Sequence, residues 1–188
     1  MHSKSLFIPL SLLNAACAFP MLAHAANSGD RPNIVLILVD DMGFSDLGIY
    51  GSEIETPNLD RLAREGIRFR EFYNNSISAP TRASLITGQY SHRAGIGYFN
   101  VNLGQPGYQG FLNRESLTFG EVLSEAGYST FLSGKWHVGN DSICWPNQRG
   151  FDHFYGFIDG ASNYYDAGEY ASPSGGRYGN HVSLVKDN

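Results

Sequence analysis

The first regular pattern in the chain is a run of six consecutive apolar residues over 34–39, most of them β-branched. A short continuous run of this kind is typical of a strand buried on both faces, as in a parallel sheet. Two adjacent carboxylates, Asp40 and Asp41, follow at its carboxyl end. Because the ligand sites of open α/β sheets collect outside the carboxyl ends of strands, these two residues are candidates for a functional site.

Helical and strand patterns alternate over the following residues. Caps, glycine stops and apolar spacing predict a helix over 56–66, a strand over 67–72, a helix over 80–88, a helix over 118–127 and a strand over 128–133. A loop rich in Gly, Tyr, Phe and Asn lies between them over 90–114, and loops of this length often carry function. The alternation predicts an α/β fold with a mostly parallel sheet flanked by helices.

The amino-terminal residues are typical of a secretory signal peptide. Lys4 supplies positive charge, an apolar stretch covers 6–13, and Ala23-His24-Ala25 is a small-residue cleavage pattern. The apolar stretch is short and interrupted, which argues against a stable membrane insertion. We expect a signal peptide over 1–25, a linker over 26–32 and a catalytic-domain segment over 33–188, exported to the periplasm or secreted. A disordered or anchoring amino terminus is the alternative.

The composition limits the class of protein. Hydrophobic residues make up 42% of the 188 residues and charged residues 16%, as in an ordinary globular domain. The net charge of −5 comes without a basic patch, so nucleic acid is not an expected partner. After signal cleavage only Cys144 would remain, which leaves no internal disulfide and no thiolate metal site. We expect Cys144 to be a packed side chain.

Four segments resemble, in the same order, motifs of the sulfatase family in the alkaline-phosphatase-like superfamily. They cover residues 31–63, 78–88, 134–139 and 150–157. The second is the most specific: the family has Cys or Ser, then Pro two residues on, Arg four on, Leu seven on and then Thr-Gly. This chain has Ser78, Pro80, Arg82, Leu85 and Thr87-Gly88 at those positions. Four matching segments in the right order make coincidence improbable.

The resemblance implies a modified nucleophile at Ser78. A serine hydroxyl is a weak nucleophile unless it is activated. In the family this residue is oxidised to formylglycine, and bacterial radical maturases oxidise the serine type. The aldehyde hydrates to a diol, and one hydroxyl attacks the sulfur of the sulfate ester and releases the alcohol. The second hydroxyl then loses its proton, the aldehyde reforms and sulfate leaves. An unmodified structural serine is the alternative.

Three further residues are implied to act on the same site. Arg82 lies about one helical turn beyond Ser78 and can therefore face the same site, near a helix amino terminus that favours anions. Lys135 and His137 are two positions apart at a strand end, so both can point to one side. By resemblance, Lys135 bridges sulfate and formylglycine, and His137 contacts the diol and takes the proton. Outside the motifs, Arg82 would be a solvated charge and His137 a structural residue.

Asp40 and Asp41 resemble the family's first two calcium ligands. Calcium takes about six to eight oxygen ligands, and the modified Ser78 and the substrate sulfate would add some. An Asp-Asn pair completes the set far downstream in the family, whereas Asp187-Asn188 lies too early and in the wrong context. A second catalytic His is also expected, and His181 does not match it. We therefore expect this chain to be the N-terminal part of the domain and inactive alone.

The predicted function is hydrolysis of a sulfate ester, either an aryl sulfate or a sulfated carbohydrate. The alternatives are a non-catalytic fragment that binds anions and a phosphate or phosphonate ester hydrolase of the same superfamily. Residues 90–114 and 159–181 are expected to shape substrate choice. Their aromatic side chains either stack on a substrate ring or belong to ordinary packing; they include Tyr98, Tyr108, Tyr164 and Tyr165.

Overall fold

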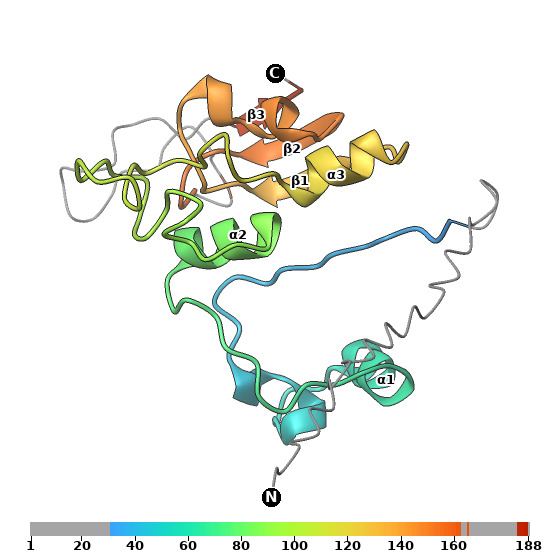
Figure 1. Cartoon of the computed structure of the whole chain (residues 1–188). Coiled ribbons are helices and arrows are strands. Elements are labelled where there is room, and N and C mark those ends of the chain that lie inside the picture. The colour runs from blue at the N-terminus through green and yellow to red at the C-terminus, as the bar shows by residue number, and fades with distance from the viewer. Residues whose placement is uncertain (1–30, 163–164, 166–183, 188) are drawn as a thin grey trace, which may run out of the picture. The chain divides into compact units, whose positions relative to one another are not determined.

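A computed structural model of the chain describes residues 31–162, 165 and 184–187 (Figure 1). The predicted signal peptide, Tyr164, His181 and most of the 159–181 loop lie outside the described residues. The chain divides into two compact units, one up to Val39 and one from Asp40 onward. None of the helices in the described ranges has the length and apolarity that a membrane crossing requires.

The described part of the first unit corrects one prediction. Residues 31–39 are extended, but they belong to no strand, and the apolar side chains over 34–39 are 42–80% exposed. The predicted buried strand at this position is therefore wrong for this structure. A strand buried on both faces needs neighbours that take its backbone hydrogen bonds and helices that cover its faces. In the described part of the chain, no strand pairs with this segment.

The second unit holds all the regular elements described. They are the 3₁₀ turns η1 (Phe44–Asp46) and η2 (Gly48–Tyr50), the helices α1 (Pro57–Glu65), α2 (Ser78–Thr87) and α3 (Phe119–Glu125), the strand β1 (Phe131–Lys135), the turns η3 (Ser142–Cys144) and η4 (Pro146–Arg149), and the strands β2 (His153–Phe157) and β3 (Leu184–Lys186). The sheet has the order β1-β2-β3, with β1 parallel to β2 and β2 antiparallel to β3.

The three predicted helices are confirmed, with changes at their ends. The capping box of α3 forms as predicted: the Glu121 amide donates to Thr118 Oγ1 at 3.0 Å, and the Thr118 amide donates to the Glu121 carboxylate at 2.7 Å. Helix α2 begins at Ser78 and not at Pro80, so Ser78 lies inside the first turn. The strand predicted over 128–133 is observed as β1 at Phe131–Lys135.

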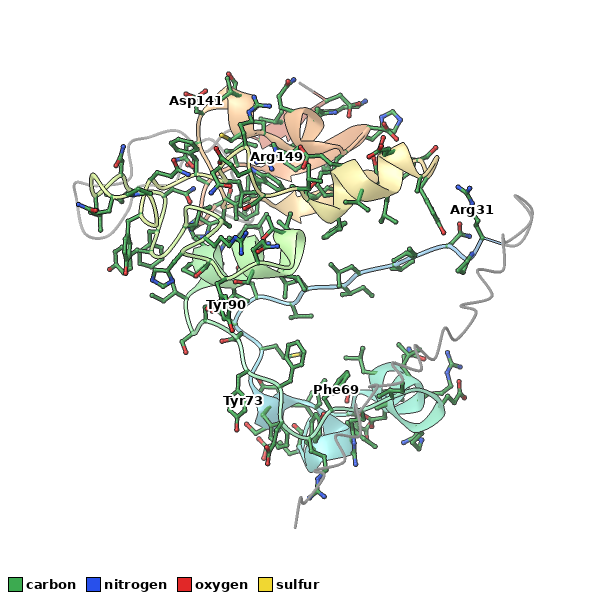
Figure 2. The ribbon with its side chains drawn as sticks, in the orientation of Figure 1. Arg31, Phe69, Tyr73, Tyr90, Asp141 and Arg149 are labelled. Carbon is green, nitrogen blue, oxygen red and sulfur yellow. The ribbon has the colours of Figure 1, made fainter. Side chains whose placement is uncertain are left out.

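The strand predicted over 67–72 is wrong. These residues form no strand, and their large apolar side chains are exposed, with Ile67 at 86%. As with residues 34–39, the β-branched and aromatic residues favour a β-strand. A strand forms only where a second strand is available to pair with it. Figure 2 labels Phe69 of this segment and Tyr73, which follows it; both are exposed.

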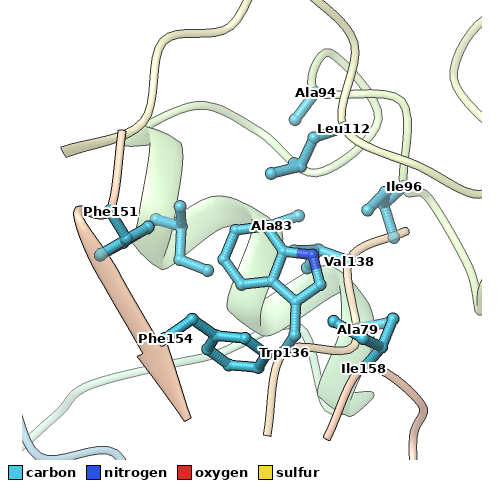
Figure 3. Packing of buried hydrophobic residues seen from close by; sticks show 11 residues of the cluster. Ala79, Ala83, Ala94, Ile96, Leu112, Trp136, Val138, Phe151, Phe154 and Ile158 are labelled. Carbon is cyan, nitrogen blue, oxygen red and sulfur yellow. The ribbon is translucent and has the colours of Figure 1, made fainter. Parts of the chain in front are cut away.

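The core of the second unit is centred on Trp136, which follows β1 directly. Figure 3 shows its indole ring between Phe154 of β2 and the small residues Ala79 and Ala83 of α2. All four are almost fully buried, and the alanines let the helix approach the ring closely. Trp136 is therefore a core residue. Phe151 of the fourth motif is buried as well, whereas Tyr155 is 56% exposed.

Cys144 is also buried, in agreement with its prediction as a packed side chain. Its carbonyl oxygen accepts the Trp136 indole N–H at 3.1 Å. Burial raises the pKa of the Cys144 thiol, so the thiol stays protonated at neutral pH.

A buried arginine ties the loop before α3 to the turn before β2 (Figure 2). Arg149 is 1% exposed, and its guanidinium forms an ion pair with Glu121 at 3.1 Å. The same group donates to three backbone carbonyls, those of Leu112 at 3.3 Å, Asn113 at 3.2 Å and Ser116 at 2.6 Å. The planar guanidinium thus supplies hydrogen bonds to backbone carbonyls of a loop that forms no helix or sheet.

Candidate active site

The structure brings together four residues that the sequence placed in two separate segments. Ser78 is the first residue of α2, Arg82 lies one turn further along that helix, Lys135 ends β1, and His137 follows two residues later. Arg82 Nε donates to Ser78 Oγ at 3.2 Å, and His137 Nδ1 lies 3.3 Å from the same oxygen. The Ser78 hydroxyl therefore has a cation on one side and an imidazole nitrogen on another.

Asp40 joins this group through two cations. Its carboxylate accepts from Lys135 Nζ at 2.7 Å and from Arg82 Nη2 at 3.3 Å. Arg82 also donates from Nη1 to the Lys135 carbonyl oxygen at 2.7 Å, which ties α2 to the end of β1. One helix, one strand end and the residue that opens the second unit thus meet at a single charged cluster.

The charges of this cluster shift one another's pKa values. Burial alone would raise the pKa of the Asp40 carboxyl, but the hydrogen bond and charge of Lys135, with those of Arg82, outweigh burial and lower it. Burial lowers the pKa of the Arg82 guanidinium, and the charge of Asp40 opposes that change. Arginine remains a cation at any physiological pH. The cluster therefore has two positive groups and one negative group.

His137 is held as a neutral imidazole. His137 is 5% exposed, and burial together with the charges of Lys135 and Arg82 lowers its pKa to about 3. Its backbone is left-handed (φ 57°), and its amide donates to the Ile158 carbonyl at 2.9 Å. A neutral imidazole has one ring nitrogen free of a proton, so His137 can accept a proton from an oxygen at position 78.

The position of Ser78 in α2 matters for anion binding. The first amides of a helix have no intrahelical partner and carry the positive end of the helix dipole. Because Ser78 is itself the first helical residue, its side chain lies at this end, beside Arg82. An oxyanion at Ser78 would meet backbone N–H groups and two cationic side chains.

The described residues fit part of a calcium site. Asp40 and Asp41 offer hard carboxylate oxygens, which is the donor type that calcium prefers. Asp41 is exposed and has a left-handed backbone (φ 59°). Over residues 31–162 and the short described stretch at 184–187, no group of three or more His, Cys, Asp or Glu side chains could hold a metal ion. These residues therefore fit as two ligands of a larger set.

A helix amino terminus, two cationic side chains and a neutral imidazole form a site suited to an anionic group. Comparison with known proteins identifies its family. The sulfatase family profile matches residues 32–182, and the chain belongs to the sulfatase family.

Relatives with known names support this assignment. The chain is 36% identical over 169 residues to the arylsulfatase of Klebsiella aerogenes, covering 88% of this chain and 35% of that protein. It is 43% identical over 139 residues to the N-acetylgalactosamine-6-sulfatase of Rattus norvegicus, covering 70% of this chain and 26% of that protein. The chain thus spans about a third or less of the length of these curated relatives.

Solved structures confirm the fold class. The PsFucS1 sulfatase from Pseudoalteromonas sp. superposes with a TM-score of 0.59 at 35% identity, covering 72% of this chain and 27% of that one. Ps i-CgsB superposes with a TM-score of 0.62 at 40% identity, covering 71% of this chain and 29% of that one. The expectation of a sulfatase fold is confirmed, and the chain spans less than a third of each of these structures.

Two residues around His137 were not predicted individually. Phe99 stacks on the imidazole, with ring centroids 6.1 Å apart and an interplanar angle of 27°. Gly160 packs against the same ring. The sequence indicated only that the loops containing them, 90–114 and 159–181, carry function. Neither residue has a motif of its own, and both are distant from His137 along the chain.

Proposed function

We propose that this chain is the N-terminal part of the catalytic domain of an exported sulfuric ester hydrolase whose nucleophile is formylglycine made from Ser78. The observation that carries the proposal is the placement of Ser78 Oγ, within 3.2 Å of Arg82 Nε and 3.3 Å of His137 Nδ1 at the start of α2. Membership of the sulfatase family supports it. The proposed partner is a serine-oxidising radical maturase.

In this proposal the cations bind the sulfate group. Arg82 and Lys135 share the Asp40 carboxylate in the structure, so both side chains already point at one acidic oxygen. A sulfate oxygen near Ser78 would take the same donors, with Arg82 supplying a planar pair and Lys135 a point charge. Cations placed where negative charge develops lower the barrier because they need no reorganisation during the reaction.

His137 is the proposed proton acceptor. Oxidation of Ser78 would supply a hydrated aldehyde, one hydroxyl of which attacks the sulfur of the ester. Nδ1 of His137 lies 3.3 Å from the oxygen at position 78, and the low pKa of the ring keeps it neutral. In the tautomer whose proton is on Nε2, Nδ1 is the free acceptor. The imidazole can therefore take the proton of the second hydroxyl when sulfate is released. General base catalysis of this kind typically contributes about 10²–10⁴-fold.

Asp40, Asp41 and the oxygen at position 78 are the proposed calcium ligands of this chain. A bound calcium ion would offset charge on the sulfate and help orient it. Asp40 would then serve the metal on one side and the two cations on the other.

The proposed substrate is a sulfate ester of a ring-bearing alcohol, either an aryl group or a carbohydrate. Support comes from similarity to the arylsulfatase of Klebsiella aerogenes and to Ps i-CgsB, which has been solved in complex with k-i-k-neocarrahexaose. The loop over 90–114 contributes an exposed tyrosine pair, Tyr90 and Tyr98, suited to stacking against such rings.

The nucleophile can be tested by mass spectrometry. When the full-length protein is co-expressed with a serine-oxidising maturase, the peptide containing Ser78 should lose the mass of two hydrogen atoms, and the protein should release sulfate from an activated aryl sulfate. Activity from a preparation with only unmodified serine would overturn the mechanism. Hydrolysis of an aryl phosphate in preference to the sulfate would assign the chain to the phosphate ester hydrolases instead.

Calcium is expected to stabilise the full-length protein and to be required for turnover. At a calcium concentration of about 100 times Kd, binding adds roughly 2.7 kcal/mol of stability. Asp40→Asn should abolish the calcium-dependent rise in Tm and the binding heat in calorimetry. Glu53→Gln, which removes the same charge from an exposed position, should leave both unchanged. Full activity after thorough chelation would contradict the metal assignment.

A further inference from the structure

We infer that Gly160 and Phe99 are positioning residues that together hold the His137 imidazole against Ser78. The inference deepens the proposed function, because it assigns residues that orient the proton acceptor of that site. Phe99 precedes His137 in the sequence and Gly160 follows it, and both contact its ring.

Gly160 sits against the end of the ring that points away from Ser78. A Cβ atom added at this glycine would lie 2.5 Å from His137 Nε2, 2.7 Å from Cε1 and 3.0 Å from Cδ2. Carbon atoms do not approach so closely, so any side chain here would move the imidazole. The backbone of Gly160 is not in the left-handed range, so steric room at the ring is the requirement for glycine.

Phe99 covers a face of the same ring. The two rings are nearly parallel, at 27° with centroids 6.1 Å apart, and Tyr98 packs edge-on against Phe99 at 4.7 Å. Aromatic contacts of this kind are worth about 0.5–1.5 kcal/mol beyond the burial of area. Phe99 therefore restricts the tilt of the imidazole, while Gly160 restricts movement of the ring at its Nε2 edge.

The backbone on both sides limits any alternative position for the ring. The amides of Trp136 and His137 donate to the carbonyls of Phe157 and Ile158, each at 2.9 Å, so the residue that carries the imidazole is fixed to the strand end beside Gly160. With its backbone held, the side chain can respond to pressure at Nε2 only by rotating. Rotation would lengthen the 3.3 Å separation between Nδ1 and Ser78 Oγ.

The test is Gly160→Ala in the full-length, maturase-treated protein, with Ala161→Ser as the control. The control also adds one heavy atom, but to an exposed neighbour. Misplacement of a catalytic group by about 1 Å can cost about 10²-fold in rate. We expect kcat for an activated aryl sulfate to fall by about that factor in Gly160→Ala, with KM and the formylglycine content of residue 78 unchanged. Ala161→Ser should match the wild type.

A second readout is independent of turnover. In protein with ¹³C-labelled histidine, the His137 ring signal, assigned by its loss in His137→Gln, should move in Gly160→Ala. It should also lose its ring-current shift in Phe99→Leu. Because both residues hold the ring, Phe99→Leu alone should also lower kcat, and Gly160→Ala combined with Phe99→Leu should recover none of the kcat lost in Gly160→Ala.

The outcomes separate this inference from the proposed function. Wild-type kcat and an unmoved His137 signal in Gly160→Ala would overturn the positioning role. So would a loss of kcat explained entirely by a lower formylglycine content. If the wild type releases no sulfate although the His137 signal moves as expected, the proposed function fails and the assignment of the ring contacts to Gly160 and Phe99 stands.

Discussion

Replacing Ser78 with alanine is expected to abolish hydrolysis of sulfate esters by the full-length protein, a loss of roughly 10⁶-fold, as seen when a serine nucleophile is removed. Alanine has no oxygen to oxidise, so the position cannot supply a nucleophile. The change removes a half-buried hydroxyl that contacts Arg82 and His137, and it keeps the helix. Initial rates on an activated aryl sulfate measure the effect, and circular dichroism checks the fold.

The matched control is Ser84→Ala, six positions further along the same helix. Ser84 Oγ accepts a hydrogen bond from the Asn75 side-chain amide at 3.0 Å and, within the described residues, none from the charged cluster. This variant should keep turnover within a small factor of the wild type. Turnover by Ser78→Ala comparable to that of Ser84→Ala would show that the nucleophile lies elsewhere.

Replacing Arg149 with methionine should lower the free energy of unfolding by about 3–5 kcal/mol, the usual cost of breaking a buried ion pair from one side. Methionine fills a similar volume, but it leaves the Glu121 carboxylate and three backbone carbonyls without their donor. Unsatisfied buried acceptors carry a desolvation penalty that packing does not offset. Urea unfolding of the full-length protein, followed by fluorescence, measures the difference.

Two further variants serve as controls for Arg149→Met. Arg64→Met on α1 removes an arginine from an exposed helix position and should change stability by no more than about 0.5 kcal/mol. Arg149→Lys should remain strongly destabilised, because a point ammonium cannot reproduce the planar donor set. Equal stability of Arg149→Met and Arg64→Met would show that the buried network contributes little.

Interactions between residues close together in the sequence were enough to predict the helices and the contact between Ser78 and Arg82. A capping box needs only residues three positions apart, so Thr118 and Glu121 were sufficient to predict α3. One helical turn separates Ser78 from Arg82, and their 3.2 Å contact follows from the helix itself. The ordered motifs also indicated the sulfatase family, which the comparisons confirm.

Only the tertiary structure decided what depends on distant partners. Apolar composition over 34–39 predicted a buried strand, but a strand exists only where another strand accepts its hydrogen bonds. His137 lies 59 positions from Ser78 and Lys135 lies 95 positions from Asp40, and no spacing rule reports such contacts. The neutral state of His137 likewise follows from burial beside Lys135 and Arg82, since desolvation and nearby charge belong to the folded site and not to the residue.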